Sequence, residues 1–153
     1  MNTTASPKQF CTFFLNGFFF GVEVLNVQEV IRYQEMTRVP LAPCTVQGLI
    51  NLRGQIVTAI DLRERLNFPP RGEEDALPTN VVIRTEDGAV SLLVDEIGDV
   101  LEMDEELFEH PPENMGKEAR QMIKGVYKLN DNLLLHLDIH RTIDISATLP
   151  SAA

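Results

Sequence analysis

Residues 48–62 (GLINLRGQIVTAIDL) constrain the fold of this chain more than any other segment. Two apolar runs flank Arg53-Gly54, and a glycine at the second position of a two-residue turn is typical of a β-hairpin. The segment predicts a strand, a tight turn, a second strand and a short helix over residues 62–66 that Asp61 can cap. Arg53 stands at the turn, where its permanent charge is either solvated or directed at a partner. No catalytic side chain accompanies it, which favours a recognition surface on a small β-rich protein.

Short apolar segments with turn residues between them recur along the rest of the chain. Strands are predicted over residues 10–15, 18–24, 27–33, 81–84, 90–94, 100–103, 122–129 and 133–139. Asn16-Gly17 is expected to be a hairpin turn, and residues 86–88 and 130–132 are expected to join two further hairpins. Pro43 suits the first turn of a short helix. This spacing favours small β-barrels with low helical content over a βαβ sheet.

The boundary between subdomains is expected in residues 67–80, which contain three prolines and an acidic run. Alternation along the strand before Arg53 predicts that Leu52 points into a barrel. Residues 141–145 are expected to form a terminal helical turn.

Two sets of apolar residues have more members than the buried face of a single strand can hold. Some of the phenylalanines near the start are expected to line a groove or a subdomain interface (Phe10, Phe13, Phe14, Phe18, Phe19, Phe20). Part of an aliphatic set is expected to be an exposed anchor for a helical partner (Val24, Val27, Val30, Ile31).

Composition narrows the class of protein. The chain has 153 residues, enough for one ordinary domain or two small subdomains that share a core. Its formal charge of −10 disfavours nucleic acid and anionic membranes as partners and favours a basic surface. No apolar run approaches the roughly 18 residues of a membrane helix, and residues 1–8 lack the features of a signal peptide. Cys11 and Cys44 are expected to be buried thiols in a reducing, cytosolic compartment.

A metal site is the first chemistry to consider. His136, Asp138 and His140 alternate, so on a continuous strand they share one face and could hold zinc. However, the other histidine, His110, falls in a predicted loop, and two histidines on a strand face are more often solvated. A metal-binding barrel therefore remains a weaker alternative. The cysteines lack a nucleophile signature, and no serine elbow or phosphate-binding glycine loop is present. No enzyme activity, cofactor or metal is expected.

Several motifs in order resemble the CheW family of chemotaxis coupling proteins over about residues 9–145. The first are residues 18–24 (FFFGVEV), 27–31 (VQEVI), 37–40 (TRVP) with Pro43, 48–54 centred on Asn51-Leu52-Arg53-Gly54, and 57–62 ending in Ile60-Asp61-Leu62. Residues 93–95 (LVD), 100–101, 124–126 (KGV) and 133–138 follow in the family's order. Together, their order and spacing are highly specific.

The resemblance implies two five-stranded SH3-like β-barrels packed on a shared hydrophobic seam, with few short helices. The first barrel is expected over about residues 16–78 and the second over about 79–145 plus the strand 9–15, with flexible tails at 1–8 and 146–153. The implied function is that of a non-catalytic scaffold. It couples the cytoplasmic tips of chemoreceptors to the regulatory domain of a CheA-type histidine kinase, in receptor arrays at the membrane but without membrane insertion. An adaptor of another chemosensory pathway, such as surface motility or pili, stays open.

The resemblance also assigns two partner surfaces. The receptor-facing groove is assigned Arg53 with four apolar residues (Val27, Val30, Val100, Leu101). Contact with the kinase regulatory domain is assigned to three residues of the first barrel (Glu29, Thr37, Gly48). His136 and His140 depart from the family, which more often has an aliphatic and a charged residue there. A receptor tip is a helical hairpin, so its apolar stripe can fit such a groove while Arg53 binds a carboxylate or carbonyl.

Overall fold

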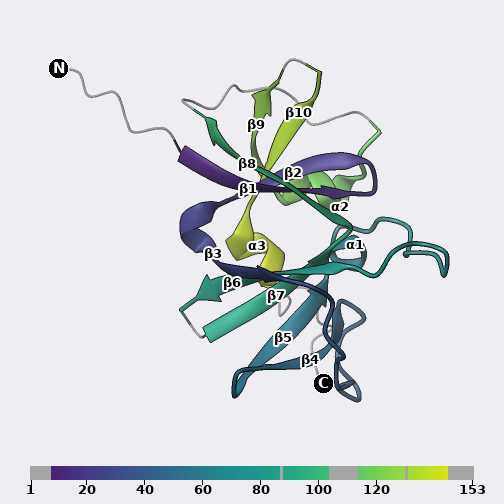
Figure 1. Cartoon of the computed structure of the whole chain (residues 1–153). Coiled ribbons are helices and arrows are strands. Elements are labelled where there is room, and N and C mark those ends of the chain that lie inside the picture. Colours follow the sequence, from purple (N-terminus) through teal and green to yellow (C-terminus); the bar gives the residue numbers. More distant parts are fainter. Residues whose placement is uncertain (1–7, 87, 104–113, 130, 145–153) are drawn as a thin grey trace.

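The computed structural model describes residues 8–86, 88–103, 114–129 and 131–144, and these form two five-stranded sheets with short helices (Figure 1). Sheet A has the order β8-β1-β2-β10-β9, with β1 (Lys8–Leu15), β2 (Phe18–Glu23), β8 (Glu96–Met103), β9 (Ile123–Lys128) and β10 (Leu133–Leu137). Sheet B has the order β3-β6-β7-β5-β4, with β3 (Val27–Ile31), β4 (Val46–Leu52), β5 (Gln55–Asp61), β6 (Thr79–Thr85) and β7 (Gly88–Val94). The helices are η1 (Val24–Asn26), α1 (Leu62–Arg65), α2 (Lys117–Gln121) and α3 (Ile139–Ile143).

The hairpin turns follow from their residues. Asn16 and Gly17 between β1 and β2 have φ angles of 52° and 83°, and Arg53 and Gly54 between β4 and β5 have φ angles of 53° and 86°. Two successive positive φ angles define the turn whose twist matches that of the flanking strands. The side-chain oxygen of Asn51 accepts a hydrogen bond from the Gly54 N–H at 2.9 Å, which supports the second turn. Both predicted hairpins are confirmed.

Sheet membership differs from the predicted barrel boundaries of 16–78 and 79–145. β1 pairs with both β2 and β8, so the first strand does join the second sheet as expected. However, β2 also belongs to sheet A, where it pairs with β10 in parallel. β6 and β7 belong to sheet B, where β7 pairs with β5 in parallel. All five strands of sheet B therefore come from residues 27–94, and the proline-rich segment connects two parts of that one sheet.

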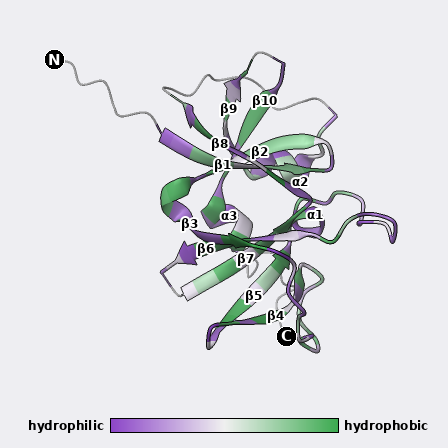
Figure 2. Ribbon diagram, viewed as in Figure 1, coloured by the Kyte–Doolittle hydropathy of each residue, from purple (hydrophilic) through white to green (hydrophobic). Residues whose placement is uncertain are grey.

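The largest hydrophobic core lies between the sheets, in agreement with a shared seam. It combines Phe13 and Phe20 of sheet A with Ile60 and Leu92 of sheet B, among other buried residues. A second cluster belongs to sheet A and contains the phenylalanines that alternate with the first pair (Phe10, Phe19), and a third lies in sheet B (Ile50, Ala59, Leu93). The phenylalanines are thus divided between the two faces of sheet A, as expected. Figure 2 shows the hydrophobic strands of both sheets and the hydrophilic β4–β5 turn.

The short helices correct several local predictions. α1 begins after Asp61, whose carboxylate accepts a hydrogen bond from the Arg63 N–H at 3.1 Å, as predicted. Asp138 caps α3 in the same way, so the last strand ends before residue 139 and the terminal helix begins two residues early. α2 is not among the predicted elements, and turns rather than a helix surround Pro43. No helix in the described part of the chain is long and apolar enough to span a membrane.

The cysteines only partly fit their prediction. Cys11 of β1 is half-buried, and burial raises the pKa of its thiol. Cys44 is exposed, in the turn before β4. The expectation of two buried thiols is therefore wrong for Cys44, because the segment that carries it lies on the surface.

Candidate functional site

Arg53 and Glu29 form a bidentate ion pair on the surface of sheet B. Nη1 and Nη2 of Arg53 donate to the two carboxylate oxygens of Glu29 at 2.7 and 2.9 Å. The Arg53 side chain is 72% exposed and that of Glu29 is 20% exposed. The hydrogen bonds between them raise the pKa of Arg53 and lower the pKa of Glu29. The pair joins β3 at one edge of the sheet to the turn that follows β4 at the other edge, so it helps to close the sheet into a barrel.

A second contact between the same edges involves Thr37 and Gly48. Thr37 and Leu49 exchange two backbone hydrogen bonds of 2.9 and 2.8 Å, which attach the segment after β3 to β4. Gly48 is buried under this contact, and a Cβ atom at that position would lie 2.8 Å from the Met36 Cβ and from the Thr37 carbonyl oxygen. A glycine is therefore needed for the chain to approach β4 this closely. Thr37 itself is exposed.

The apolar residues assigned to the receptor surface occupy two edge strands. Val30 of β3 is 40% exposed and Val100 of β8 is 58% exposed. Val27 is half-buried against the main core, and Leu101 is half-buried against the second cluster of sheet A. β3 and β8 belong to different sheets, so these four residues span both subdomains. The structure brings Arg53 and Glu29 together, whereas Val30 and Val100 remain on separate strands.

Ile56 is a surface residue that the sequence reasoning missed. It lies on β5 opposite Asn51, two residues after Gly54, and is 61% exposed. Alternation carries the signal at this end of the strand, because Val57 is fully buried and Ile56 beside it faces the other way. Ile56 is thus an exposed apolar residue on the hairpin that carries Arg53.

The histidines do not form the shared face that the sequence suggested. His136 lies on β10 and is 2% exposed, with its Nε2 atom 3.8 Å from the Glu23 carboxylate and its ring 4.8 Å from that of Phe10. Asp138 caps α3, and His140 is exposed on that helix, so the proposed alternation is wrong. His110 lies outside the described residues. Within the described ranges no three His, Cys, Asp or Glu side chains are placed to hold a metal ion.

The comparisons with known proteins agree with this architecture. A family model described as "CheW-like domain" matches residues 9–147. The chain is 32% identical to the chemotaxis protein CheW of Bacillus subtilis over 137 residues, which cover 90% of this chain and 87% of the relative. It is 28% identical to the chemotaxis protein CheW of Treponema pallidum over 136 residues, covering 87% and 80%. The crystal structure of scaffolding protein TtCheW from Thermoanaerobacter tengcongensis superposes with a TM-score of 0.78 at 25% identity, covering 94% of this chain and 92% of that chain.

The family match covers both sheets, and the superposed structure has the same arrangement along nearly its full length. The expectations of a mainly β fold with two SH3-like subdomains and of a non-enzymatic role are thereby confirmed. The chain belongs to the CheW-like family, the non-catalytic scaffolds that couple chemoreceptors to the kinase CheA in chemotaxis.

Proposed function

We propose that this chain, on the cytoplasmic side of receptor arrays, binds a receptor signalling tip through Arg53 and the neighbouring apolar residues of β3 and β8 (Val27, Val30, Val100, Leu101). The regulatory domain of a CheA-type kinase binds the adjoining part of sheet B, at Glu29, Thr37 and Gly48. The observation that carries the proposal is the bidentate pair between Arg53 and Glu29, because it fixes an exposed guanidinium at the end of a rigid hairpin.

The exposure of this pair favours recognition over a purely structural role. Ion pairs in full contact with water contribute little to stability. Arg53 also adopts a positive φ, which is unfavourable for a residue with a Cβ atom. An arginine kept at such a position, with its planar fork already oriented, is suited to an acidic or carbonyl group on a helical partner. Val30 and Val100 supply exposed apolar area for the stripe of the same helix.

The roles of Thr37 and Gly48 are less direct. Thr37 is exposed and can meet a partner, whereas Gly48 is buried beneath the Thr37 backbone. We therefore assign Gly48 an indirect part, in which it shapes the surface that Thr37 presents. Signals would pass through the assembly as small changes in these contacts, since the scaffold performs no reaction.

The proposal is tested with Arg53→Ala and Glu29→Gln, which break the same ion pair from opposite sides. A receptor-tip fragment and the kinase regulatory domain are titrated separately against each variant. Arg53→Ala is expected to weaken receptor binding by roughly tenfold, the scale of a lost charge-assisted contact at an interface. Glu29→Gln is expected to weaken kinase-domain binding and, because it releases the guanidinium that the pair orients, to weaken receptor binding by less than Arg53→Ala does. Arg84→Ala, which removes another exposed arginine of sheet B, serves as the control and changes neither affinity.

Kinase autophosphorylation in the presence of receptor fragments then reports coupling. Loss of stimulation by Arg53→Ala, with an unchanged unfolding midpoint, would support the assignment. Unchanged receptor affinity in a folded Arg53→Ala variant would refute it.

A further inference from the structure

Asp95 lies where the chain passes from sheet B to sheet A, between β7 and β8. Its backbone N–H donates to the Phe14 carbonyl at 3.2 Å, and its Oδ2 accepts a hydrogen bond from the Asn16 N–H at 2.9 Å. Phe14 and Asn16 belong to the β1–β2 hairpin. Asp95 is thus attached on one side to β1 and to the turn that follows β1.

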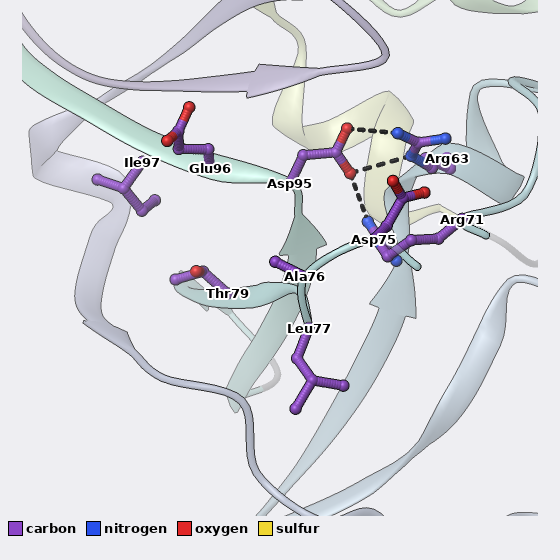
Figure 3. Close-up of a pocket in the computed structure, with 9 residues that line it drawn as sticks. All are labelled: Arg63, Arg71, Asp75, Ala76, Leu77, Thr79, Asp95, Glu96 and Ile97. Atoms are coloured by element: carbon purple, nitrogen blue, oxygen red, sulfur yellow. Dashed lines mark hydrogen bonds and ion pairs between the residues drawn. The ribbon is translucent and has the colours of Figure 1, made fainter. Parts of the chain in front are cut away.

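The same carboxylate is attached to sheet B on its other side (Figure 3). Arg63 of α1 donates from Nε to Oδ1 at 2.9 Å and from Nη2 to Oδ2 at 2.7 Å. Arg71, in the segment between α1 and β6, donates to Oδ1 at 2.7 Å. Arg63 also donates to the Pro69 carbonyl at 3.0 Å, which fastens the proline-rich segment to the same point. We call Asp95 with Asn16, Arg63 and Arg71 the Asp95 junction.

Both arginines of the Asp95 junction are shielded from water, unlike Arg53 in its pair with Glu29. The side chains of Arg63, Arg71 and Asp95 are 14%, 15% and 22% exposed. Removing the carboxylate charge would leave two guanidinium groups side by side without their shared partner. Like charges held close together repel, and shielding from water strengthens that repulsion. The contacts of the junction are therefore coupled through one side chain.

A second connection between the sheets also begins at α1. Arg65 is 8% exposed and donates to the Thr142 carbonyl at 2.8 Å and the Arg141 carbonyl at 2.7 Å. Both carbonyls belong to α3, which follows the last strand of sheet A and lies between the two sheets (Figure 1). Two arginines of α1 therefore connect it to separate parts of the chain, Arg63 to Asp95 and Arg65 to α3.

The polar contacts and the apolar seam have different mechanical consequences. Hydrophobic burial depends on area and has no preferred direction, so the apolar seam constrains the angle between the sheets less sharply than directional bonds do. Short hydrogen bonds to a carboxylate are directional and tolerate little change in geometry. The angle between the sheets should then depend on the junction more than on the seam.

We infer that Asp95 is a positioning residue that fixes the orientation of sheet A relative to sheet B. If the proposed function holds, Asp95 also sets the geometry in which the receptor and kinase surfaces are presented together. The residue contacts neither proposed surface, so its effect on coupling is exerted through the angle between the sheets.

The orientation is measured by residual dipolar couplings of backbone amides in the isotopically labelled full chain. In the wild type, one alignment tensor is expected to fit the amides of both sheets. In Asp95→Asn, each sheet is expected to fit its own coordinates with a separate tensor. Glu29→Gln breaks a bidentate pair of similar geometry within sheet B alone and should retain the single tensor. Arg71→Gln removes one donor and provides a milder variant if Asp95→Asn does not fold.

The positioning role would be overturned if one tensor with the wild-type orientation fits both sheets of Asp95→Asn. If only Arg71→Gln folds, the same result in that variant would overturn it. Separate binding titrations with the receptor fragment and the kinase domain follow, with affinities expected to stay within about twofold of wild type. Kinase stimulation by the complete assembly should fall by roughly 2- to 30-fold, the range for residues that modulate coupling without touching a ligand. Reorientation with undiminished stimulation would overturn the link to coupling. The dipolar couplings need no partner, so they decide the role of Asp95 even if the proposed function fails.

Discussion

Gly48→Ala tests whether the contact beneath Thr37 is a requirement of the fold. The added methyl group would lie 2.8 Å from the Met36 Cβ and the Thr37 carbonyl oxygen, and the latter is a backbone atom that cannot rotate away. If the contact is kept, overpacking costs about 1–3 kcal/mol. If the segment moves off β4, the two hydrogen bonds with Leu49 are lost at about 0.5–1.5 kcal/mol each.

Alanine also restricts the unfolded chain, which offsets about 0.4–1 kcal/mol of that loss. The expected net decrease in the free energy of unfolding is therefore about 1–2 kcal/mol. Urea denaturation followed by far-UV circular dichroism measures it, since the chain has no tryptophan to serve as a fluorescence probe. Gly72→Ala is the matched control, because a Cβ there would meet only the Asp75 carboxylate, at an ordinary 3.5 Å.

The control variant is expected to stay within about 0.5 kcal/mol of wild type, as surface substitutions usually do. Gly48→Ala with wild-type stability but weakened binding to the kinase domain would refute this reasoning and would instead favour direct contact between Gly48 and the kinase. Lower stability without any partner present would support an intramolecular role.

Two further predictions concern acid stability and the core. Burial opposes ionisation of Asp95, but hydrogen bonds from Arg63, the Asn16 N–H and Arg71 outweigh it and lower the pKa from 3.8 to about 2. The ionised group therefore stabilises the fold above pH 4 by about 1–2 kcal/mol after solvent screening, and this contribution disappears as the pH falls towards 2. Urea titrations should show a gap between wild type and Asp95→Asn at pH 7 that narrows in acid; a constant gap would contradict the assignment. Leu135→Ala should lower the free energy of unfolding by about 2–5 kcal/mol because Leu135 is 1% exposed in the main core. Leu52→Ala should cost less than about 1.5 kcal/mol because the structure leaves that side chain half-exposed, and equal losses in denaturant titrations would contradict the ranking.

Local turn chemistry made the hairpins predictable. Asn16-Gly17 and Arg53-Gly54 form two-residue turns that a glycine at the second position favours, and Asp61 caps the helix that follows β5. These features depend on a few adjacent residues. The alternation of apolar and polar residues predicted the strands for the same reason, because it too depends on residues close together in the sequence. The order of the motifs identified the family.

Sheet membership could not be predicted in the same way. The pairings of β2 with β10 and of β5 with β7 are parallel and join strands far apart in the sequence. His136 is buried because that pairing makes β10 an inner strand, between β2 and β9. Leu52 follows the alternation of the buried Gly48 and Ile50 but is only half-buried, because it ends its strand beside the turn.

The surface site was predicted in part. Arg53 was singled out as a charge on a rigid turn, but its partner Glu29 lies 24 residues away and is reached only because the barrel closes. The sequence assigned the two residues to different partners, and their bidentate contact shows that the two assigned surfaces adjoin. Asp95 carried no visible signal beyond its place in a family motif, since its four donors come from three separate segments.

The interleaved strand order has a consequence for synthesis on the ribosome. Sheet B is built from the uninterrupted residues 27–94, so all of its strands emerge together and can pair before the remainder is made. β1 and β2 emerge earlier, yet their outer neighbours β8 and β10 are translated after sheet B is complete. Both edges of the phenylalanine-rich β1–β2 hairpin therefore stay unpaired while about half of the chain is synthesised. Unpaired strand edges of this kind promote association with other chains. The nascent protein is most prone to aggregate during that interval, and faster translation of residues 24–95 would shorten it.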